Sequence, residues 1–486
     1  MANRIIGLET EFGCFVRDPA LGSFDEVVER VKDYAFRPGG WGLMDRHSRD
    51  PYFEPAGAGG FLLNGGRLYV DAVGSHEEYA TPECRSLVDL IRYDKAGQRL
   101  LVRILRELGW SDRASFHNNN VDHFGGHTFG CHENYSLNAE ALHSGMELDA
   151  LVPFLVTRQI YAGAGRVGGH RLTGDWRRMA RDVQRHPADY VFLDKIYGVE
   201  PDPSVQFQLS QRADHILHVA SGRVRFNRAL INPKWDTRYD LSHSPRLHML
   251  FGESNVLEYA AYLKVGTTAL VLDLIEAGEA PSGLELADPI RTLRQVSRDP
   301  SWRWPVERQY GGTIPAVDLQ RQYLRAAQRY LSGRDAETDR LLRDWEETLD
   351  ALERDPPSLS GRLDWVTKRA IMELYIQSEG VSWDDEALQS LDLEYHHLDP
   401  ERGLTGALTN QVRLTDEEAI ERALREPPAD TRAYGRGKVI RGFLAQHIRN
   451  YVVEWDSVSA GARHTLVFED PFHNYAAETE RFLSEL

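Results

Sequence analysis

The 486-residue chain has only 3 cysteines, Cys14, Cys84 and Cys131, and none of them stand in the CxxC spacing of metal or redox motifs. So few cysteines exclude a disulfide framework and indicate a reducing compartment. Long apolar runs are also missing, because no stretch approaches the ~20 consecutive apolar residues that cross a bilayer. The N-terminus has no apolar signal core. These absences predict a cytoplasmic protein with no membrane partner.

Positive charge is in deficit, with 57 Lys and Arg against 74 Asp and Glu and a net charge of −17. A surface of this sign repels nucleic acid, so none is expected as a partner. The ATP-binding motif GxxxxGK[ST] and the nucleophile motif GxSxG are missing as well. What remains is an ordinary globular balance, 42% hydrophobic and 27% charged. The length suits a large catalytic domain with a smaller companion.

The N-terminal segment alternates between apolar and polar residues from Arg4 to Phe12, which predicts a strand with Glu9 and Glu11 on its outer face. A second strand is predicted over Leu62–Ala72, and its outer face consists of Arg67, Tyr69 and Asp71. Glu78 follows in the next segment. If the two strands are neighbours, four carboxylates and one phenol converge on one face.

Like charges at such spacing raise one another's pKa unless a cation lies between them. Oxygen donors of this kind suit Mg²⁺, which usually arrives with nucleotide phosphates. Taken singly, each acid is better explained as a solvated or salt-bridged surface residue, and only their conjunction on one face puts a cation site on an equal footing. For Glu11 direct ligation and a salt bridge both stay open. Arg212, Arg246 and His248 are further candidates for phosphate contact, with core salt bridges as the alternative.

Helical periodicity predicts helices in five segments, 25–36, 87–108, 257–276, 317–354 and 417–424. Pro38–Gly60 reads as a long loop of the kind that forms a lid. Short strands are predicted at 207–209, 246–251 and Tyr451–Trp455. The pattern predicts helices that back a sheet, with Leu414–Leu486 as the body of a small C-terminal domain.

Two motifs suggest cofactors that their context does not support. Phe116–Tyr135 holds four histidines and Cys131, but His123 and His127 lie in a glycine-broken stretch, which disfavours a zinc site. The asparagines of this segment suit the polar floor of a binding site instead. Gly163–Gly168 matches GxGxxG, but a helix end and not a strand is predicted before it, which favours a tight turn over NAD binding.

Several segments resemble the family of Pup ligases and Pup deamidase/depupylases, relatives of glutamine synthetase and glutamate-cysteine ligase. The main ones are Arg4–Gly13 (RIIGLETEFG), Asn64–Asp71 (NGGRLYVD), Ser75–Cys84 (SHEEYATPEC) and Gly130–Tyr135 (GCHENY). Further matches lie at 154–159, 209–213, 263–267 and 469–472. The similarity spans nearly the whole chain.

The resemblance implies an α+β fold with a glutamine synthetase-like curved antiparallel sheet backed by helices. It implies a catalytic domain over residues 1–410 and a small C-terminal domain over 411–486 that completes the ATP site. The implied activity is ATP-dependent ligation of the γ-carboxylate of a Pup-like modifier's C-terminal glutamate to substrate lysines, through an acyl phosphate. The partners are then the modifier and lysine-bearing proteins, and the cofactors are ATP and Mg²⁺.

Matched position by position, the resemblance assigns magnesium ligation to Glu9, Tyr69 and Glu78. It assigns ATP contacts to Arg67, Thr81 and Trp455, and the catalytic carboxylate to Asp71. A general base at Asp71 would take a proton from the attacking lysine. The alternation along the two predicted strands and the segment after them had already singled out these residues, apart from Thr81 and Trp455.

Three features depart from the family pattern. One extra residue, Ala72 or Val73, follows Asp71; the loop 37–60 has a length between those of ligases and depupylases; and residues 169–204 look like an insertion. A depupylase or deamidase therefore stays open as an alternative, and a small-molecule carboxylate-amine ligase as a third. Gly130-Cys131 favours the ligase, because depupylases usually have Gly-Thr there.

Overall fold

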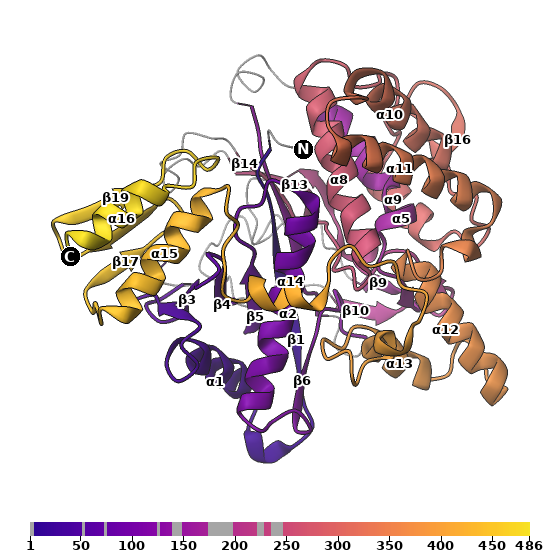
Figure 1. The fold of residues 1–486 in the computed structure, drawn as a ribbon. Helices are drawn as coiled ribbons and strands as arrows, with labels where there is room; N and C mark the ends of the chain where they lie inside the picture. The colour runs from indigo at the N-terminus through magenta and orange to yellow at the C-terminus, as the bar shows by residue number, and fades with distance from the viewer. Residues whose placement is uncertain are drawn as a thin grey trace.

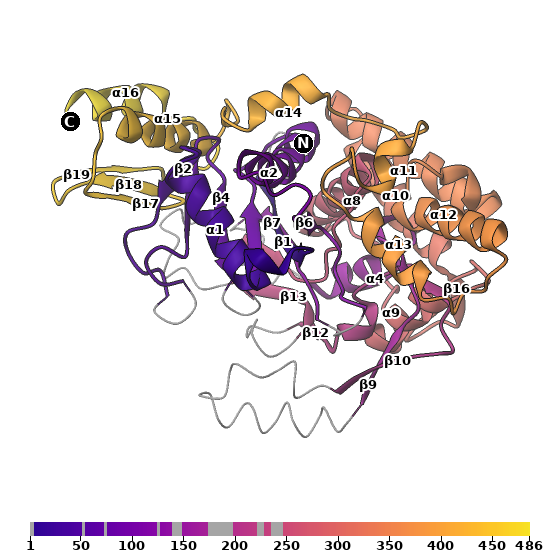
Figure 2. The ribbon, with the colours of Figure 1, turned by 90° about the horizontal axis from the view of Figure 1, so that it is seen from below.

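The computed structural model describes residues 4–50, 54–71, 75–123, 127–138, 148–173, 198–220, 228–234 and 246–486. Within them a central sheet lies between a helical region and a C-terminal unit, which Figure 1 shows at the left in yellow. The view from below in Figure 2 keeps this order, with the two flanking regions at opposite ends. No helix among the described residues is long and apolar enough to cross a membrane.

The central sheet has 10 strands in the order β12-β13-β14-β7-β1-β5-β4-β3-β2, and β6 pairs with β1 off this path. Its strands are β1 (Ile6–Val16), β2 (Gly42–Met44), β3 (Gly59–Leu62), β4 (Arg67–Asp71), β5 (His76–Ala80), β6 (Ala114–His117), β7 (Cys131–Ser136), β12 (His218–Ala220), β13 (Ala229–Lys234) and β14 (Arg246–Met249). All paired strands are antiparallel except β12 and β13. The predicted sheet is confirmed, with one parallel pair at its edge.

Helices α1 (Phe24–Phe36) and α2 (Leu87–Glu107) pack on the apolar face of this sheet. That face buries Leu8 and Phe12 of β1 and Leu68 of β4, which belong to the main hydrophobic core. Because side chains alternate along a strand, the polar residues between them point to the opposite face. The helices thus cover one face and leave the other for the polar residues.

The helical region completes the main core. Its helices are α4 (Leu151–Thr157), α5 (Gln159–Ala162), α8 (Glu258–Glu276), α9 (Pro289–Arg298), α10 (Ala316–Leu331), α11 (Ala336–Arg354), α12 (Asp364–Glu379) and α13 (Ala387–Tyr395). Short strand pairs join β8 (Arg166–Val167) to β11 (Phe207–Gln208), β9 (His170–Thr173) to β10 (Gly198–Pro201), and β15 (Pro305–Glu307) to β16 (Thr313–Pro315). The helical segment predicted over 317–354 is two helices, separated at Gly333, where φ is +79°.

The segment predicted as one strand over Leu62–Ala72 contains a turn. The backbone of Gly65 has φ of +82°, and the Asn64 side chain accepts a hydrogen bond from the Gly66 N–H at 2.9 Å. Asn-Gly sequences favour this conformation because glycine tolerates positive φ. The strand expected from residue 62 is therefore the end of β3 and all of β4. The extra residue proposed at 72 or 73 lies outside the described residues.

The segment predicted as a long loop, Pro38–Gly60, contains β2 and the first residues of β3, so the loop interpretation was wrong over those parts. These strands were not predicted from the sequence because they contain glycine, which has low strand propensity and gives no alternation of apolar and polar side chains. Here it is needed: a Cβ added to Gly60 would lie 2.1 Å from the Leu43 carbonyl oxygen. Residues 174–197, the bulk of the proposed insertion, lie outside the described part of the chain.

The C-terminal unit has its own apolar core. It contains α15 (Arg432–Ala445), β17 (Tyr451–Val453), β18 (Ser457–Ala460), β19 (His464–Val467) and α16 (Ala476–Ser484). Leu43, Phe61 and Leu63 of the sheet region join this core, whereas α14 (Glu417–Ala423) packs against α2 and the main core. The predicted domain division at residues 410 and 411 stays a prediction. The strand predicted over Tyr451–Trp455 ends at Val453.

Candidate active site

A row of polar side chains crosses three adjacent strands on the uncovered face of the sheet. Glu11 of β1 lies directly opposite Glu78 of β5, and Glu78 lies opposite Tyr69 of β4. Residues opposite one another in antiparallel strands share a face. Glu9, two residues before Glu11, lies on the same face, so the convergence that the sequence predicts is present.

Carboxylate oxygens of Glu11, Asp71 and Glu78 lie within 4.8 Å of one another. Burial, followed by the charges of Glu11, Glu9 and Asp71, raises the pKa of Glu78 well above its ordinary value. Burial, followed by the charges of Glu78 and Glu9, raises the pKa of Tyr69 well above its ordinary value. The cluster carries more negative charge than its surroundings balance, which makes it a suitable site for a cation.

Glu11 is held as a carboxylate by its neighbours. His76 Nδ1 lies 3.3 Å from its Oε2, and the Gly130 backbone N–H donates to the same oxygen at 2.7 Å. Burial opposes ionisation, but these bonds and the nearby charges of His76 and His132 lower the pKa of Glu11 to about 2. Its interaction with His76 supports the salt-bridge interpretation, and its other oxygen lies 3.8 Å from His132 Nε2.

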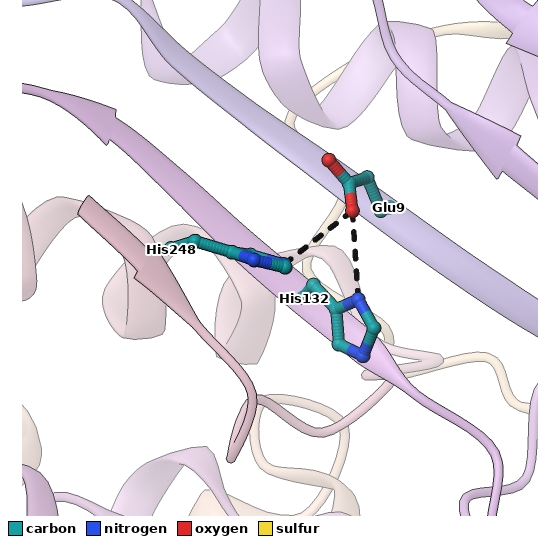
Figure 3. A group of neighbouring side chains, drawn as sticks. All are labelled: Glu9, His132 and His248. Atoms are coloured by element: carbon teal, nitrogen blue, oxygen red, sulfur yellow. Dashed lines mark ion pairs between the residues drawn. The ribbon is translucent and has the colours of Figure 1, made fainter. Parts of the chain in front are cut away.

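Glu9 lies between two histidines (Figure 3). His132 Nδ1 and His248 Nε2 each lie 3.5 Å from its Oε2, and Arg246 Nη1 lies 3.4 Å from its Oε1. Burial opposes ionisation, but these groups hold the pKa of Glu9 well below its ordinary value. Arg246 and His248, which the sequence offered as phosphate contacts, are thus salt-bridged to a predicted metal ligand.

Sequence reasoning did not assign a role to His132. It occupies β7 directly opposite Glu9, and the alternating burial of Cys131–Ser136 shows the strand that places it there. A strand interpretation of this segment would have placed the imidazole on the carboxylate face. The pairing of β7 with β1 connects distant parts of the sequence, so the contact itself was not predictable.

Arg67 lies two residues before Tyr69 on the same face of β4 and is 3% exposed. Its Nη2 donates to Asp45 Oδ2 at 2.8 Å, and its guanidinium lies 4.3 Å from the centre of the Tyr69 ring. Burial lowers the pKa of Arg67, but the charges of Asp45 and Glu54 outweigh burial and raise it. Its buried Nε has no hydrogen-bond partner among the described residues, so one N–H is available to an anion.

Phe61 lies between Trp455 of the C-terminal unit and Arg67 of β4. The Trp455 and Phe61 rings make an edge contact with 5.0 Å between their centres, and Phe61 lies opposite Arg67 in the pairing of β3 with β4. The Arg436 guanidinium packs 4.8 Å from the centre of the Trp455 ring. The C-terminal unit therefore reaches the same edge of the polar face.

Thr81 follows β5 and is buried. Its hydroxyl oxygen accepts a hydrogen bond from the Leu8 N–H at 3.0 Å and lies 3.5 Å from where a Cβ on Gly7 would be. Gly7 shares the face of Glu9, so the hydroxyl lies beside that face. Six of the seven predicted site residues thus lie on one face of the sheet or at its edge. The seventh, Trp455, contacts Phe61, which is paired with Arg67.

The motifs outside this face behave as structural elements. His123 Nε2 lies 3.1 Å from the Asp392 carboxylate and does not join a histidine cluster with His132. Asn120 is buried and donates to the Phe129 carbonyl, which is one of the backbone contacts expected of these amides; the polar floor stays a prediction. The GxGxxG segment follows α5, and Gly165 and Gly168 have positive φ, which confirms a turn. Arg212 Nη1 donates to the Leu250 carbonyl at 2.6 Å.

Comparisons with known proteins agree with this geometry. The family model of the Pup-ligase protein matches residues 4–459. A Pup–protein ligase of Acidimicrobium ferrooxidans is 36% identical over 100% of this chain and 99% of its own, and a depupylase of Acidothermus cellulolyticus is 35% identical over 94% and 90%. The solved complex of the prokaryotic ubiquitin-like protein Pup with its ligase PafA matches with a TM-score of 0.78 at 30% identity, over 99% of this chain and 91% of that one. A solved Pup ligase PafA in complex with ADP matches with a TM-score of 0.73 at 31% identity, over 88% and 90%.

Proposed function

This chain belongs to the Pup-ligase family, and we propose on that basis that it is an ATP-dependent ligase that joins a Pup-like protein modifier to lysines of other proteins. The bond formed is an isopeptide between the γ-carboxylate of the modifier's C-terminal glutamate and the lysine amine. The observation that carries the proposal is the polar row of Glu11, Glu78 and Tyr69 across β1, β5 and β4, with Arg67 and Asp71 on either side of Tyr69 along β4.

The nucleotide is assigned to the edge of this face beside the C-terminal unit. We infer contacts with Arg67 and Thr81 from the sheet and with Trp455 from the C-terminal unit. The free N–H of Arg67 suits a phosphate oxygen, and the half-buried indole of Trp455 offers an aromatic surface. The relative solved with ADP supports nucleotide use on this fold.

Magnesium is assigned to Glu9, Tyr69 and Glu78. These residues fit the ion because they are oxygen donors on one face and because burial and nearby acids together hold the pKa of Glu78 high, a shift that a cation would oppose. Glu9 is ionised beside His132 and His248, so one ligand is charged before any ion binds. Bound Mg²⁺ would neutralise charge on the nucleotide phosphates during phosphoryl transfer.

The chemistry follows from the weakness of a carboxylate as an acyl donor. Its oxygen first attacks the γ-phosphorus of ATP, which gives an acyl phosphate and ADP; Arg67 offsets the phosphate charge. The lysine amine then attacks the acyl carbon, and phosphate leaves with the oxygen that the carboxylate supplied. We infer that Asp71 accepts the proton that the lysine loses. Asp71 suits this role because it ends β4, half-buried at the margin of the carboxylate row.

A depupylase is the second candidate, because the Acidothermus cellulolyticus relative bears that name at 35% identity. Such an enzyme would use Asp71 on the isopeptide or amide without turning over nucleotide. A small-molecule ligase is a third and would accept free glutamate. We also infer a cytoplasmic location, which the free thiols of Cys14, Cys84 and Cys131 support.

The deciding experiment supplies the enzyme with ATP, Mg²⁺, a glutamate-terminated modifier and a lysine-bearing protein, and measures ADP. A ligase releases ADP in proportion to conjugate formed, and only when modifier is present. Cleavage of a preformed conjugate without ADP release would identify a depupylase. Equal ADP release with free glutamate would identify the small-molecule ligase.

A further inference from the structure

A second cluster of ligand-type side chains lies beyond the carboxylate row, where β6 meets the end of α13; His117 is paired with Gly13, two residues after Glu11 on β1. The cluster consists of His117, Glu394 and His397, whose ligand atoms all lie within 4.8 Å of one another. The backbone holds the two histidines together: the Asn118 N–H donates to the His396 carbonyl at 3.1 Å, and the Leu398 N–H donates to the Phe116 carbonyl at 3.0 Å. His117 and His397 are therefore directly opposite in an antiparallel bridge, with ring centres 5.0 Å apart.

Both imidazoles have an unsatisfied nitrogen. The Nε2 atoms of His117 and His397 are buried without a hydrogen-bond partner among the described residues, and the two side chains are only 1% and 6% exposed. A buried polar atom without a partner is unfavourable and calls for an explanation such as a bound ion. Each of these orphaned nitrogens is therefore a candidate ligand atom.

We propose that His117, Glu394 and His397 form a binding site for a transition-metal ion of the zinc class, separate from the proposed active site. Two imidazoles and one carboxylate are a donor set of zinc sites and not of Mg²⁺, which prefers oxygen. Ligands about 2.0–2.1 Å from zinc lie roughly 3.4 Å apart, so small side-chain rotations bring the three atoms into range. A water molecule supplies the fourth position.

Two existing contacts change when the ion binds. The Asp399 N–H donates to His397 Nδ1 at 3.0 Å, so the proton of the neutral ring is on Nε2 and must move to Nδ1. The Nδ1–H would then face the Asp399 N–H, so the ring must also turn away from that backbone group, at a cost above the roughly tenfold loss of affinity for one neutral hydrogen bond. Arg17 Nη2 lies 3.5 Å from the Glu394 carboxylate, but both side chains are more than a third exposed, so Arg17 turns into solvent at little cost. Because Glu394 is partly exposed, an ion can reach the buried histidines from solvent on its side.

The test is a zinc titration of the metal-stripped full chain, without nucleotide, against a chromophoric chelator. The wild type is compared with Glu394→Gln, with the double variant Glu394→Gln/His397→Gln, and with Glu386→Gln, an exposed control at the start of α13. We expect the wild type and the control to bind one more zinc ion per chain than the double variant. Glu394→Gln should lower the affinity for that ion by at least about tenfold. Cobalt should give tetrahedral absorption that the double variant loses.

The group of Glu9, His132 and His248 has similar donors, so the comparison counts ions and does not merely detect binding. Equal zinc stoichiometry and affinity in the wild type and the double variant would overturn the proposal and leave a buried water as the occupant. Zinc should also raise the melting temperature of the wild type more than that of Glu394→Gln, whose exposed side chain leaves the fold intact. None of these readouts depends on ligase activity.

Discussion

Three glutamates of the same sheet face differ in charge because their neighbours differ. Glu9 faces two histidines and an arginine, and Glu11 faces His76 and a backbone N–H, so both ionise readily. Glu78 faces mainly other acids and resists ionisation. Of the three, Glu78 therefore holds its proton most strongly, and it is where a bound cation would change the protonation state most.

Replacement of Glu9 or Glu78 by alanine should abolish the binding of Mg-nucleotide, because each change removes a charged oxygen ligand. Isothermal titration calorimetry with Mg-ADP measures this directly. Glu346→Ala, an exposed glutamate on α11, is the control and should bind as the wild type does. If both site variants bound Mg-ADP with wild-type affinity, Glu9 and Glu78 would have no part in binding the metal ion or the nucleotide.

Asp71→Asn should leave nucleotide binding nearly intact and slow conjugation by ~10²–10⁴-fold, because the amide keeps the shape and loses the base. Nucleotide affinity and the single-turnover rate of conjugate formation should be measured on the same preparation. Asp71 would lose the role of general base if the variant formed conjugate within a few-fold of the wild-type rate.

At the scale of elements, regular periodicity in the sequence predicted most of what positions the site. The alternation around Glu9 and the 3.6-residue pattern of 87–108 correspond to β1 and α2. The glycine-rich strands β2 and β3 carried no such pattern. The contacts of Glu9 with His132 and His248 join β1, β7 and β14 across more than 100 residues, and no local signal encodes that pairing.

The C-terminal unit is fixed to the sheet by a buried ion pair. Arg436 is 0% exposed, donates to the Trp455 carbonyl at 2.5 Å and to the Gly65 carbonyl at 2.7 Å, and pairs with Glu83. Burial opposes ionisation, but Arg436 and Arg432 lower the pKa of Glu83 to about 2. Trp455 is therefore held by its backbone and its ring together, although it lies outside β17.

Trp455→Ala should weaken ATP binding, whereas Trp455→Phe should restore part of it because aromatic contact area survives. The Michaelis constant for ATP and the dissociation constant for ADP should rise together, with a smaller effect on the turnover number. Phe443→Leu, in the core of the C-terminal unit, controls for general loosening of that unit. If alanine and phenylalanine variants both bound ATP as the wild type does, Trp455 would be a packing residue only.

At the scale of the whole molecule, histidines that are buried and neutral should destabilise the fold in mild acid, whereas carboxyl groups with a raised pKa, such as Glu78, act in the opposite direction. Burial, aided by nearby arginine or lysine charges, holds the pKa of His215 and His396 well below the ordinary value. The unfolded chain gains protons below pH ~6.5 that the folded chain does not, so the free energy of unfolding decreases as the pH drops. Each such histidine contributes a loss of about 1.4 kcal/mol by about pH 5.5.

Denaturant unfolding at about pH 7.5 and about pH 5.5 measures this effect. His215→Gln should lower stability at the higher pH but show a loss between the two values that is about 1.4 kcal/mol smaller than that of the wild type. His473→Gln, an exposed position in the C-terminal unit, is the control. If the free energy of unfolding of His215→Gln fell as much between the two pH values as that of the wild type, His215 would not be a source of the pH dependence.

The most direct test of the account follows the oxygen atoms of the modifier. With oxygen-18 in the γ-carboxylate of its terminal glutamate, the acyl-phosphate route transfers one labelled oxygen to inorganic phosphate for each isopeptide formed and keeps the other in the conjugate. Mass spectrometry of phosphate and conjugate from one reaction measures both. The account predicts one labelled phosphate and one ADP per conjugate; conjugate formed with unlabelled phosphate would contradict it.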